Sequence, residues 1–245
     1  MFNVKNTLRE NRSSHKGVNF VYLPKENSKK LLIILSPHNQ GDRFCWVKIL
    51  VPSHDMSLLY INNPADDFYS LETNHAVYKE IIKSVSSIHE KKHTHIMGSS
   101  MSAFAALRIG MDLDVSVFAI GPQVVASESK EFAAKSFPKN PKLKLIDDIA
   151  QLQERGVWQN LTDFINDFNK KLPPIYLMIN HLRFDTENGY AFVDAIKRKA
   201  GSKLVCIHSK YVYHGFKIKS KEDVLTLYQI LDILTSLSEI SFSWE

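Results

Sequence analysis

Apolar and polar residues follow one another along the chain in a pattern that predicts strands and helices in turn. Continuous apolar runs at Leu31–Leu35 (LLIIL) and Ile175–Ile179 (IYLMI) are typical of strands buried on both faces. Between 74 and 89 the apolar residues recur at helical spacing and form one stripe. Because alternating strands and helices indicate a mostly parallel sheet with helices on both faces, we predict an α/β fold.

The same rules predict further elements on either side of these. Further strands are expected at 18–23, 57–61, 93–97, 115–120 and 203–207, and further helices at 101–110, 189–199 and 221–237. A charged, helix-prone segment at about 124–172 breaks the pattern, and we expect it to be a helical insertion. Because no linker, repeat or low-complexity tract divides the 245 residues, we expect a single domain over 1–245.

A serine-rich turn follows the strand expected at 93–97 and leads directly into a helix. Its residues are Gly98-Ser99-Ser100-Met101-Ser102. A nucleophile elbow needs this context, and the residues two before and two after its serine must be small. Only Ser100 has small residues at both places, although glycine is usual where Ser102 stands. Sterics therefore favours Ser100 as a nucleophile, and a serine-rich helix N-cap is the structural alternative.

The acidic partner of such a serine should follow the strand that comes after the insertion. Asp185 lies just past the strand expected at 175–179. Glu187 is the second choice, and Asp194 is the third because it falls inside the next expected helix. We therefore predict Asp185 as the carboxylate that orients the catalytic histidine.

The histidine should lie in the loop between the last strand and the last helix, and His214 does. His208 stands at the end of the strand, which is too early for its ring to reach over the sheet. A serine hydroxyl becomes a good nucleophile when a neutral imidazole takes its proton, and a carboxylate fixes the tautomer of that imidazole. Ser100, Asp185 and His214 appear in the required order and together predict a catalytic triad.

An acyl-transfer site also needs hydrogen-bond donors for the oxyanion. One expected donor is the backbone N–H of Met101, directly after the nucleophile. A second should come from the polar loop after Leu31–Leu35, where His38 and Asn39 are the candidates. Any one of these loop residues can equally belong to an ordinary surface turn.

The turn at 98–100 (GSS), together with a strand that ends in Pro-Gln at 122–123, resembles small α/β-hydrolase proteins from bacterial capsule and surface-polysaccharide loci. The resemblance implies an α/β-hydrolase fold, with Asp185 and His214 at the acid and base positions. It also places Gln123 among the oxyanion- or substrate-binding residues. Members include esterase-like proteins and polysaccharide O-acetyltransferases that use a serine triad and acetyl-CoA.

Three functions are compatible with these residues. The leading one is an esterase that acts on acyl or acetyl esters of a small molecule or a glycan through an acyl-enzyme on Ser100. The second is a polysaccharide O-acetyltransferase with the same triad, for which acetyl-CoA would be a co-substrate; neither function needs a bound cofactor. The third is a non-catalytic protein of the same fold that binds glycans or supports assembly, because fold does not imply function.

Charge and composition exclude several other classes. The net charge is +5, but the lysines and arginines are scattered and lack the aromatic interleaving of a nucleic-acid groove, so we expect no nucleic-acid partner. A positive field still raises the local concentration of anions such as acidic polysaccharide, nucleotide or anionic lipid. No metal-ligand spacing and no glycine-rich phosphate loop occurs, so no metal site is predicted.

The remaining features concern location. No apolar run is long enough to cross a bilayer, and the N-terminal residues lack the apolar region of a secretory signal. Two cysteines cannot form a disulfide framework, and Cys206, within an apolar strand, is expected in the core. We therefore expect a cytoplasmic protein; the pattern leaves its oligomeric state open.

Overall fold

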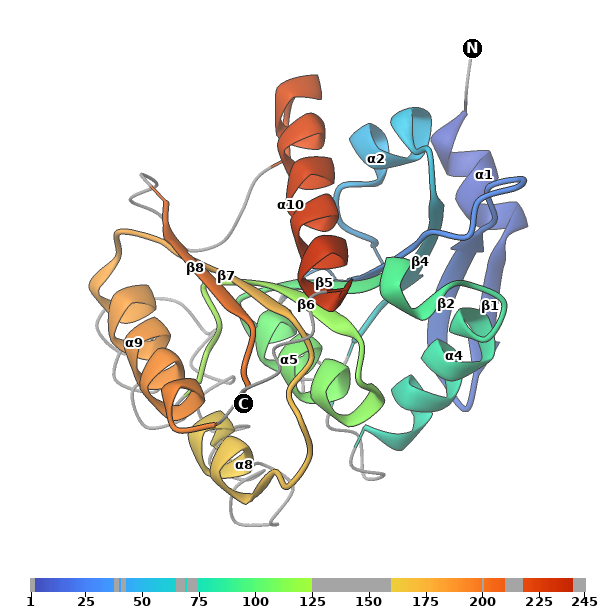
Figure 1. Cartoon of the computed structure of the whole chain (residues 1–245). Helices are drawn as coiled ribbons and strands as arrows, with labels where there is room; N and C mark the ends of the chain where they lie inside the picture. The colour runs from blue at the N-terminus through green and yellow to red at the C-terminus, as the bar shows by residue number, and fades with distance from the viewer. Residues whose placement is uncertain are drawn as a thin grey trace, which may run out of the picture.

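A computed structural model of the chain describes residues 3–37, 40, 43–64, 69, 75–124, 160–199, 201–209 and 218–239. The strands within these ranges form one sheet in the order β1-β2-β4-β3-β5-β6-β7-β8 (Figure 1). They are β1 (Arg12–His15), β2 (Val18–Leu23), β3 (Leu31–Leu35), β4 (Ser57–Ile61), β5 (Thr94–Ser99), β6 (Ser116–Ile120), β7 (Ile175–Ile179) and β8 (Leu204–His208). β1 and β2 pair antiparallel, as do β2 and β4, and every later pairing is parallel.

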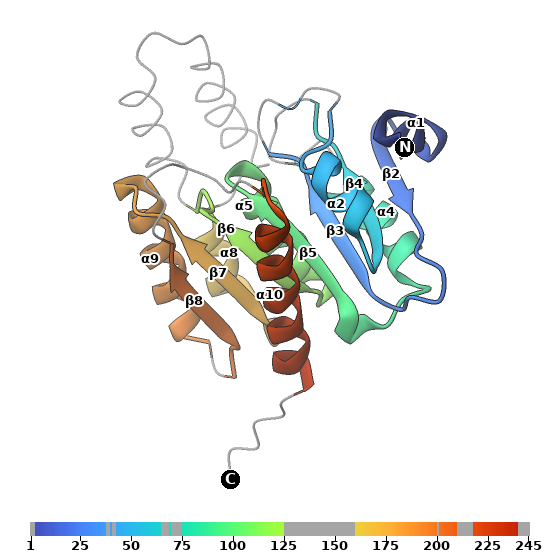
Figure 2. The same ribbon diagram turned by 90° about the horizontal axis from the view of Figure 1, so that it is seen from above.

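Helices cover both faces of this sheet. They are α1 (Val4–Glu10), α2 (Val47–Ser53), α4 (Ala76–Ser86), the short 3₁₀ turn η1 (Lys91–His93), α5 (Met101–Leu113), α8 (Leu161–Asp167), α9 (Arg183–Lys197) and α10 (Lys221–Glu239). One face carries α4, α5, α8 and α9, and the other carries α2 and α10, with α1 beside α2 (Figure 1). Figure 2 shows β2 and β8 toward opposite ends of the sheet. In the part of the chain described, no helix is long and apolar enough to cross a membrane.

The apolar core consists of two layers because successive side chains of a strand point to opposite faces. In β3, Leu31, Ile33 and Leu35 pack toward α5, while Leu32 and Ile34 pack toward α2 and α10. All five are fully buried. The predicted α/β fold, with a mostly parallel sheet covered on both faces, is therefore confirmed.

Element bounds differ from the predictions in a few places. α9 begins at Arg183 rather than at 189, so Asp185 lies within the first turn of the helix and not in a loop before it. The sequence pattern missed α1, β1 and α2. All four side chains of β1 are exposed, so it has no apolar alternation, and α2 contains Pro52. Within the expected insertion the structure describes α8, whereas 125–159 lie outside the described residues.

The expectation that Cys206 belongs to the core is wrong. Cys206 is exposed, whereas Cys45 is buried. The physical reason is that β8 is an edge strand, so neighbours cover its side chains on fewer sides than those of a central strand.

Candidate active site

The carboxyl ends of the parallel strands meet at one edge of the sheet, and the predicted nucleophile Ser100 lies at this edge. Ser100 follows β5, Asn180 follows β7, and Ser209 follows β8. At this edge, the residue after each of β5, β6 and β8 donates a backbone hydrogen bond to the neighbouring strand. The donors and acceptors are Ser100 N–H to Ile120 O at 2.9 Å, Gly121 N–H to Met178 O at 2.9 Å and Ser209 N–H to Ile179 O at 2.8 Å.

Ser100 occupies a strained turn between β5 and α5. Its φ of 60° and ψ of −123° lie outside the regions that a residue with a side chain normally adopts. Such a conformation costs on the order of 1–3 kcal/mol and persists only where the surroundings enforce it. Ser100 is partly exposed, while the residues on either side of it are buried. The turn therefore presents this one serine at the edge of the sheet.

Gly98 allows the turn to close. A Cβ atom on Gly98 would lie 2.1 Å from the carbonyl oxygen of Ser102 and 2.7 Å from the backbone nitrogen of Ala103. No side chain fits that space, since both neighbours are backbone atoms that cannot move away. The steric argument that required a small residue two positions before Ser100 therefore has a direct structural basis.

Ser102 stands where glycine is usual, and its hydroxyl has a specific role. Its Oγ accepts a hydrogen bond from the backbone N–H of Ser99 at 2.9 Å and lies 2.9 Å from the carbonyl oxygen of Ser99, to which it donates. The side chain is fully buried. The hydroxyl thus ties the end of β5 to the first turn of α5.

Asp185 is held in a fixed orientation from two sides. The side-chain amide of Asn180 donates from Nδ2 to Asp185 Oδ2 at 2.9 Å, and both residues are fully buried. Gly121, with φ of +49°, packs against the carboxylate, because a Cβ there would lie 2.9 Å from Oδ2. Gly121 directly follows Ile120, the last residue of β6, whose carbonyl accepts the hydrogen bond from the Ser100 N–H. The end of β6 therefore contacts both the Asp185 carboxylate and the turn at Ser100.

The alternative acids lie on the outer surface of α9. Glu187 forms an ion pair with Arg183 at 2.5 Å, and its side chain is half-exposed. Asp194 pairs with Lys197 at 3.5 Å and is mostly exposed. Among these three carboxylates only Asp185 is buried.

The loop after β6 is fastened to α9 by a residue that sequence reasoning missed. Asn188 accepts a hydrogen bond from the Val124 N–H at 2.6 Å and donates from Nδ2 to the Phe184 carbonyl at 3.1 Å. Gln123, predicted beside the oxyanion or substrate, lies in this fastened loop and is only 7% exposed. Neither Asn180, after β7, nor Asn188, within α9, belongs to a sequence motif that would have marked it as part of the site.

The structure describes only some of the predicted residues. Met101 is the first residue of α5, where backbone N–H groups have no acceptor within the helix. His38, Asn39 and His214 lie outside the described residues, so their roles stay predictions. The described residues stop at Ser209 and resume at Ile218, and His214 lies between these two positions in the sequence.

No group of three or more His, Cys, Asp or Glu residues in the described ranges could hold a metal ion. The groups described at this edge are the hydroxyl of Ser100, the carboxylate of Asp185 and the amide of Asn180.

Solved structures share this architecture across nearly the whole chain. A capsule O-acetyltransferase of Neisseria meningitidis serogroup A, in complex with CoA, is 16% identical with a TM-score of 0.62, and the match covers 95% of this chain and 100% of that one. A Pyrococcus furiosus esterase is 14% identical with a TM-score of 0.58, and the match covers 92% of this chain and 88% of that one. This chain has the α/β-hydrolase fold.

A third similar α/β-hydrolase structure is the acylaminoacyl peptidase of Pyrococcus horikoshii. It is 13% identical with a TM-score of 0.64, and the match covers 96% of this chain but 42% of the peptidase. This chain therefore spans less than half of that protein. No protein-family model and no curated protein sequence matches the chain. In the α/β-hydrolase fold the nucleophile stands at a strained strand-to-helix turn, and Ser100 occupies such a turn here.

Proposed function

We propose that the protein is a serine-dependent acyl-ester enzyme and that Ser100 carries the acyl group. The observation that carries this proposal is the strained backbone of Ser100, with φ of 60°, at the turn from β5 into α5. Strain of this kind costs stability and is concentrated at functional sites. A serine that only capped a helix would adopt the extended backbone typical of an N-cap.

In the proposed reaction, the Ser100 hydroxyl attacks an ester carbonyl and its proton passes to the imidazole of His214. Asp185 keeps that imidazole in the productive tautomer and stabilises the imidazolium that forms. The oxyanion accepts a hydrogen bond from the Met101 N–H and one from the loop that contains His38 and Asn39. The imidazolium then protonates the departing alcohol, and the acyl group remains on Ser100.

The second half of the reaction transfers the acyl group to an acceptor. Water as acceptor gives an esterase, which is the leading proposal. A sugar hydroxyl gives a polysaccharide O-acetyltransferase with acetyl-CoA as donor. The similarity to a capsule O-acetyltransferase, over 95% of this chain and 100% of that one, supports retaining this second function. What distinguishes the two reactions is whether the acceptor site excludes water.

Labelling with a fluorophosphonate probe tests the proposal, because the probe reacts covalently with activated serines. We expect wild-type protein to be labelled and Ser100→Ala to be unlabelled. Ser99→Ala is the matched control and should retain labelling, since Ser99 takes part in the turn through its backbone. Equal labelling of wild type and Ser100→Ala would favour the non-catalytic, glycan-binding alternative.

Acetate release separates the two catalytic proposals. An esterase releases acetate from acetyl esters at a rate that does not depend on added polysaccharide. A transferase releases little acetate from acetyl-CoA and moves the acetyl group to a polysaccharide acceptor. Mass analysis of the polysaccharide after incubation with labelled acetyl-CoA identifies the acceptor directly.

A further inference from the structure

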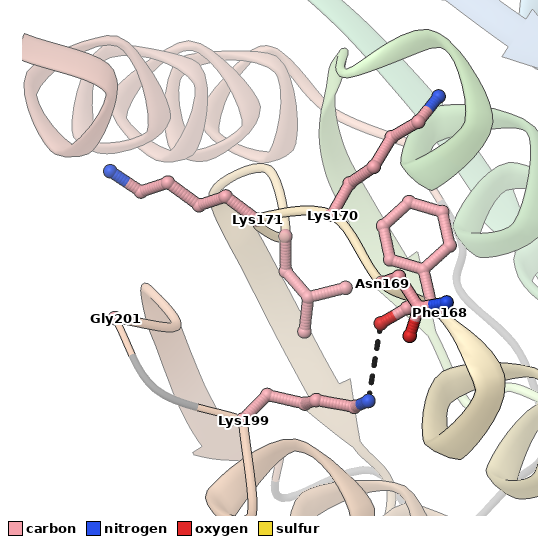
Figure 3. A pocket seen from close by; sticks show the side chains of 7 residues that line it. Phe168, Asn169, Lys170, Lys171, Lys199 and Gly201 are labelled. Atoms are coloured by element: carbon pink, nitrogen blue, oxygen red, sulfur yellow. Dashed lines mark hydrogen bonds between the residues drawn. The ribbon is translucent and has the colours of Figure 1, made fainter.

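A hollow of about 570 Å³ lies at the edge of the sheet opposite Ser100. Its described lining includes Lys170, Lys171 and Lys199 and contains no acidic residue (Figure 3); we call it the lysine hollow. The lining residues Leu172 and Gly201 precede β7 and β8, so the hollow lies at the amino ends of these strands. A strand of five residues spans about 16 Å, which separates the hollow from the catalytic edge.

The lysines of the hollow differ from other lysines at the same edge of the sheet in their partners. Lys29, before β3, pairs with Glu90 at 2.9 Å, and Lys92, before β5, pairs with Glu239 at 2.8 Å. Among the described residues, no carboxylate forms an ion pair with any of the three lysines of the hollow. Within the described part of the chain, the charge of these three lysines therefore has no carboxylate partner.

Lys171 and Lys203 bring two positive charges close together beside the hollow, whereas Lys199 is held by backbone oxygens. The Lys199 ammonium donates to the carbonyl oxygens of Asn166 at 2.8 Å and Phe168 at 3.1 Å, at the carboxyl end of α8, where a cation is favoured. Lys203, beside the hollow, has its pKa lowered by burial and then by the ammonium of Lys171. Lys171 and Lys203 therefore repel each other, and an anionic ligand would relieve that repulsion.

The directions of the ammonium groups indicate the shape of the ligand. In Figure 3, Lys170 and Lys171 extend to opposite sides of the hollow, while Lys199 crosses below them. A compact anion needs donors that converge on one point, whereas a polymer with spaced charges can meet donors that are spread. The aromatic ring of the lining, Phe168, packs against Phe164 with centroids 5.5 Å apart, so the hollow has no series of stacking platforms for nucleobases.

We propose that the lysine hollow binds a stretch of an acidic polysaccharide, and thereby holds the chain of a glycan substrate at a second place away from the catalytic edge. The choice of a glycan rests on the proposed function, whereas the negative charge of the ligand follows from the hollow alone. Binding is electrostatic and therefore weakens as salt is added.

The test compares two charge-matched double variants. Lys170→Glu with Lys171→Glu reverses two exposed charges of the hollow and leaves Lys199 to bind the end of α8. Lys25→Glu with Lys48→Glu makes the same change in net charge at exposed positions outside the hollow. Titration with fluorescent oligogalacturonate at low salt measures binding. We expect the hollow variant to weaken binding at least about fivefold more than the control does, with a shallower dependence on salt.

Several results would overturn the proposal. These are equal weakening by the two double variants, equally tight binding of neutral dextran, and tighter binding of poly(U) than of oligogalacturonate. Fluorophosphonate labelling of the same samples keeps the two proposals apart. If the protein binds oligogalacturonate but is not labelled, the proposed serine chemistry is wrong and the binding proposal is retained. If the protein is labelled but does not bind oligogalacturonate, the binding proposal is wrong.

Discussion

At the scale of single residues, Asn180 orients the carboxylate of Asp185, which we propose as the partner of the catalytic histidine. Its amide holds Oδ2 at 2.9 Å, and Asn180→Ala removes that donor while both positions remain buried. We expect fluorophosphonate labelling to slow about 10- to 100-fold, because small displacements of catalytic groups have large kinetic effects. Asn166→Ala, at an exposed position, is the control. Unchanged labelling by Asn180→Ala would show that the hydrogen bond does not orient the acid.

Ser102 gives a second prediction at this scale, on stability. In Ser102→Ala the buried N–H of Ser99 loses its acceptor, which costs about 1–3 kcal/mol of the free energy of unfolding. Urea denaturation measures the change. Ser13→Ala, on the exposed strand β1, should change it by less than about 0.5 kcal/mol. If the two variants unfold alike, the hydroxyl of Ser102 does not stabilise the turn.

The same residues show what a sequence can predict about a site. The choice of Ser100 was possible because the clash that requires Gly98 arises within five consecutive residues. The contact of Gly121 with Asp185 was not predictable, because it depends on the pairing of β6 with β7 in space. The direction of the Ser102 hydroxyl was hidden as well, since composition does not determine a rotamer.

At the scale of elements, the residues of α9 show why the sequence pattern placed the start of this helix at 189 rather than at Arg183. Its first turns direct Asp185 and Asn188 inward, and both are fully buried. Polar residues on the inner face interrupt the apolar spacing from which a helix is predicted. The strands β3 and β7 were predictable to the residue, because a strand buried on both faces is apolar throughout.

A prediction at this scale concerns the attachment of α9 to the loop after β6. Asn188→Leu keeps the size of the side chain but leaves the Val124 N–H without its acceptor at 2.6 Å. We expect the free energy of unfolding to fall by about 1–3 kcal/mol. Asp194→Ala, on the exposed face of the same helix, should change it by less than about 0.5 kcal/mol, and urea titration of both variants measures the difference. A loss of stability confined to Asp194→Ala would contradict the assigned role of Asn188.

At the scale of the whole molecule, two buried histidines link the stability of the fold to pH. His95, on β5, lies 3.2 Å from the Thr235 hydroxyl on α10, and His75 precedes α4 on the other face. Burial, followed by nearby positive charges, lowers the pKa of each to about 3. Both therefore stay neutral in the folded protein at pH values where they are protonated in the unfolded chain.

The sign of the pH effect follows from this difference. Above the unfolded pKa of about 6.5 neither state binds these protons, so the full stability is present. As the pH falls from about 6.5 toward about 3, the unfolded chain binds more protons, and each histidine costs up to about 1.4 kcal/mol per pH unit. Urea denaturation between pH 7.5 and pH 5 should show this loss. His95→Gln should flatten the slope, whereas His181→Gln, at an exposed position, should leave it unchanged. A slope that is the same in wild type and His95→Gln would mean that His95 does not contribute to the acid sensitivity of the fold.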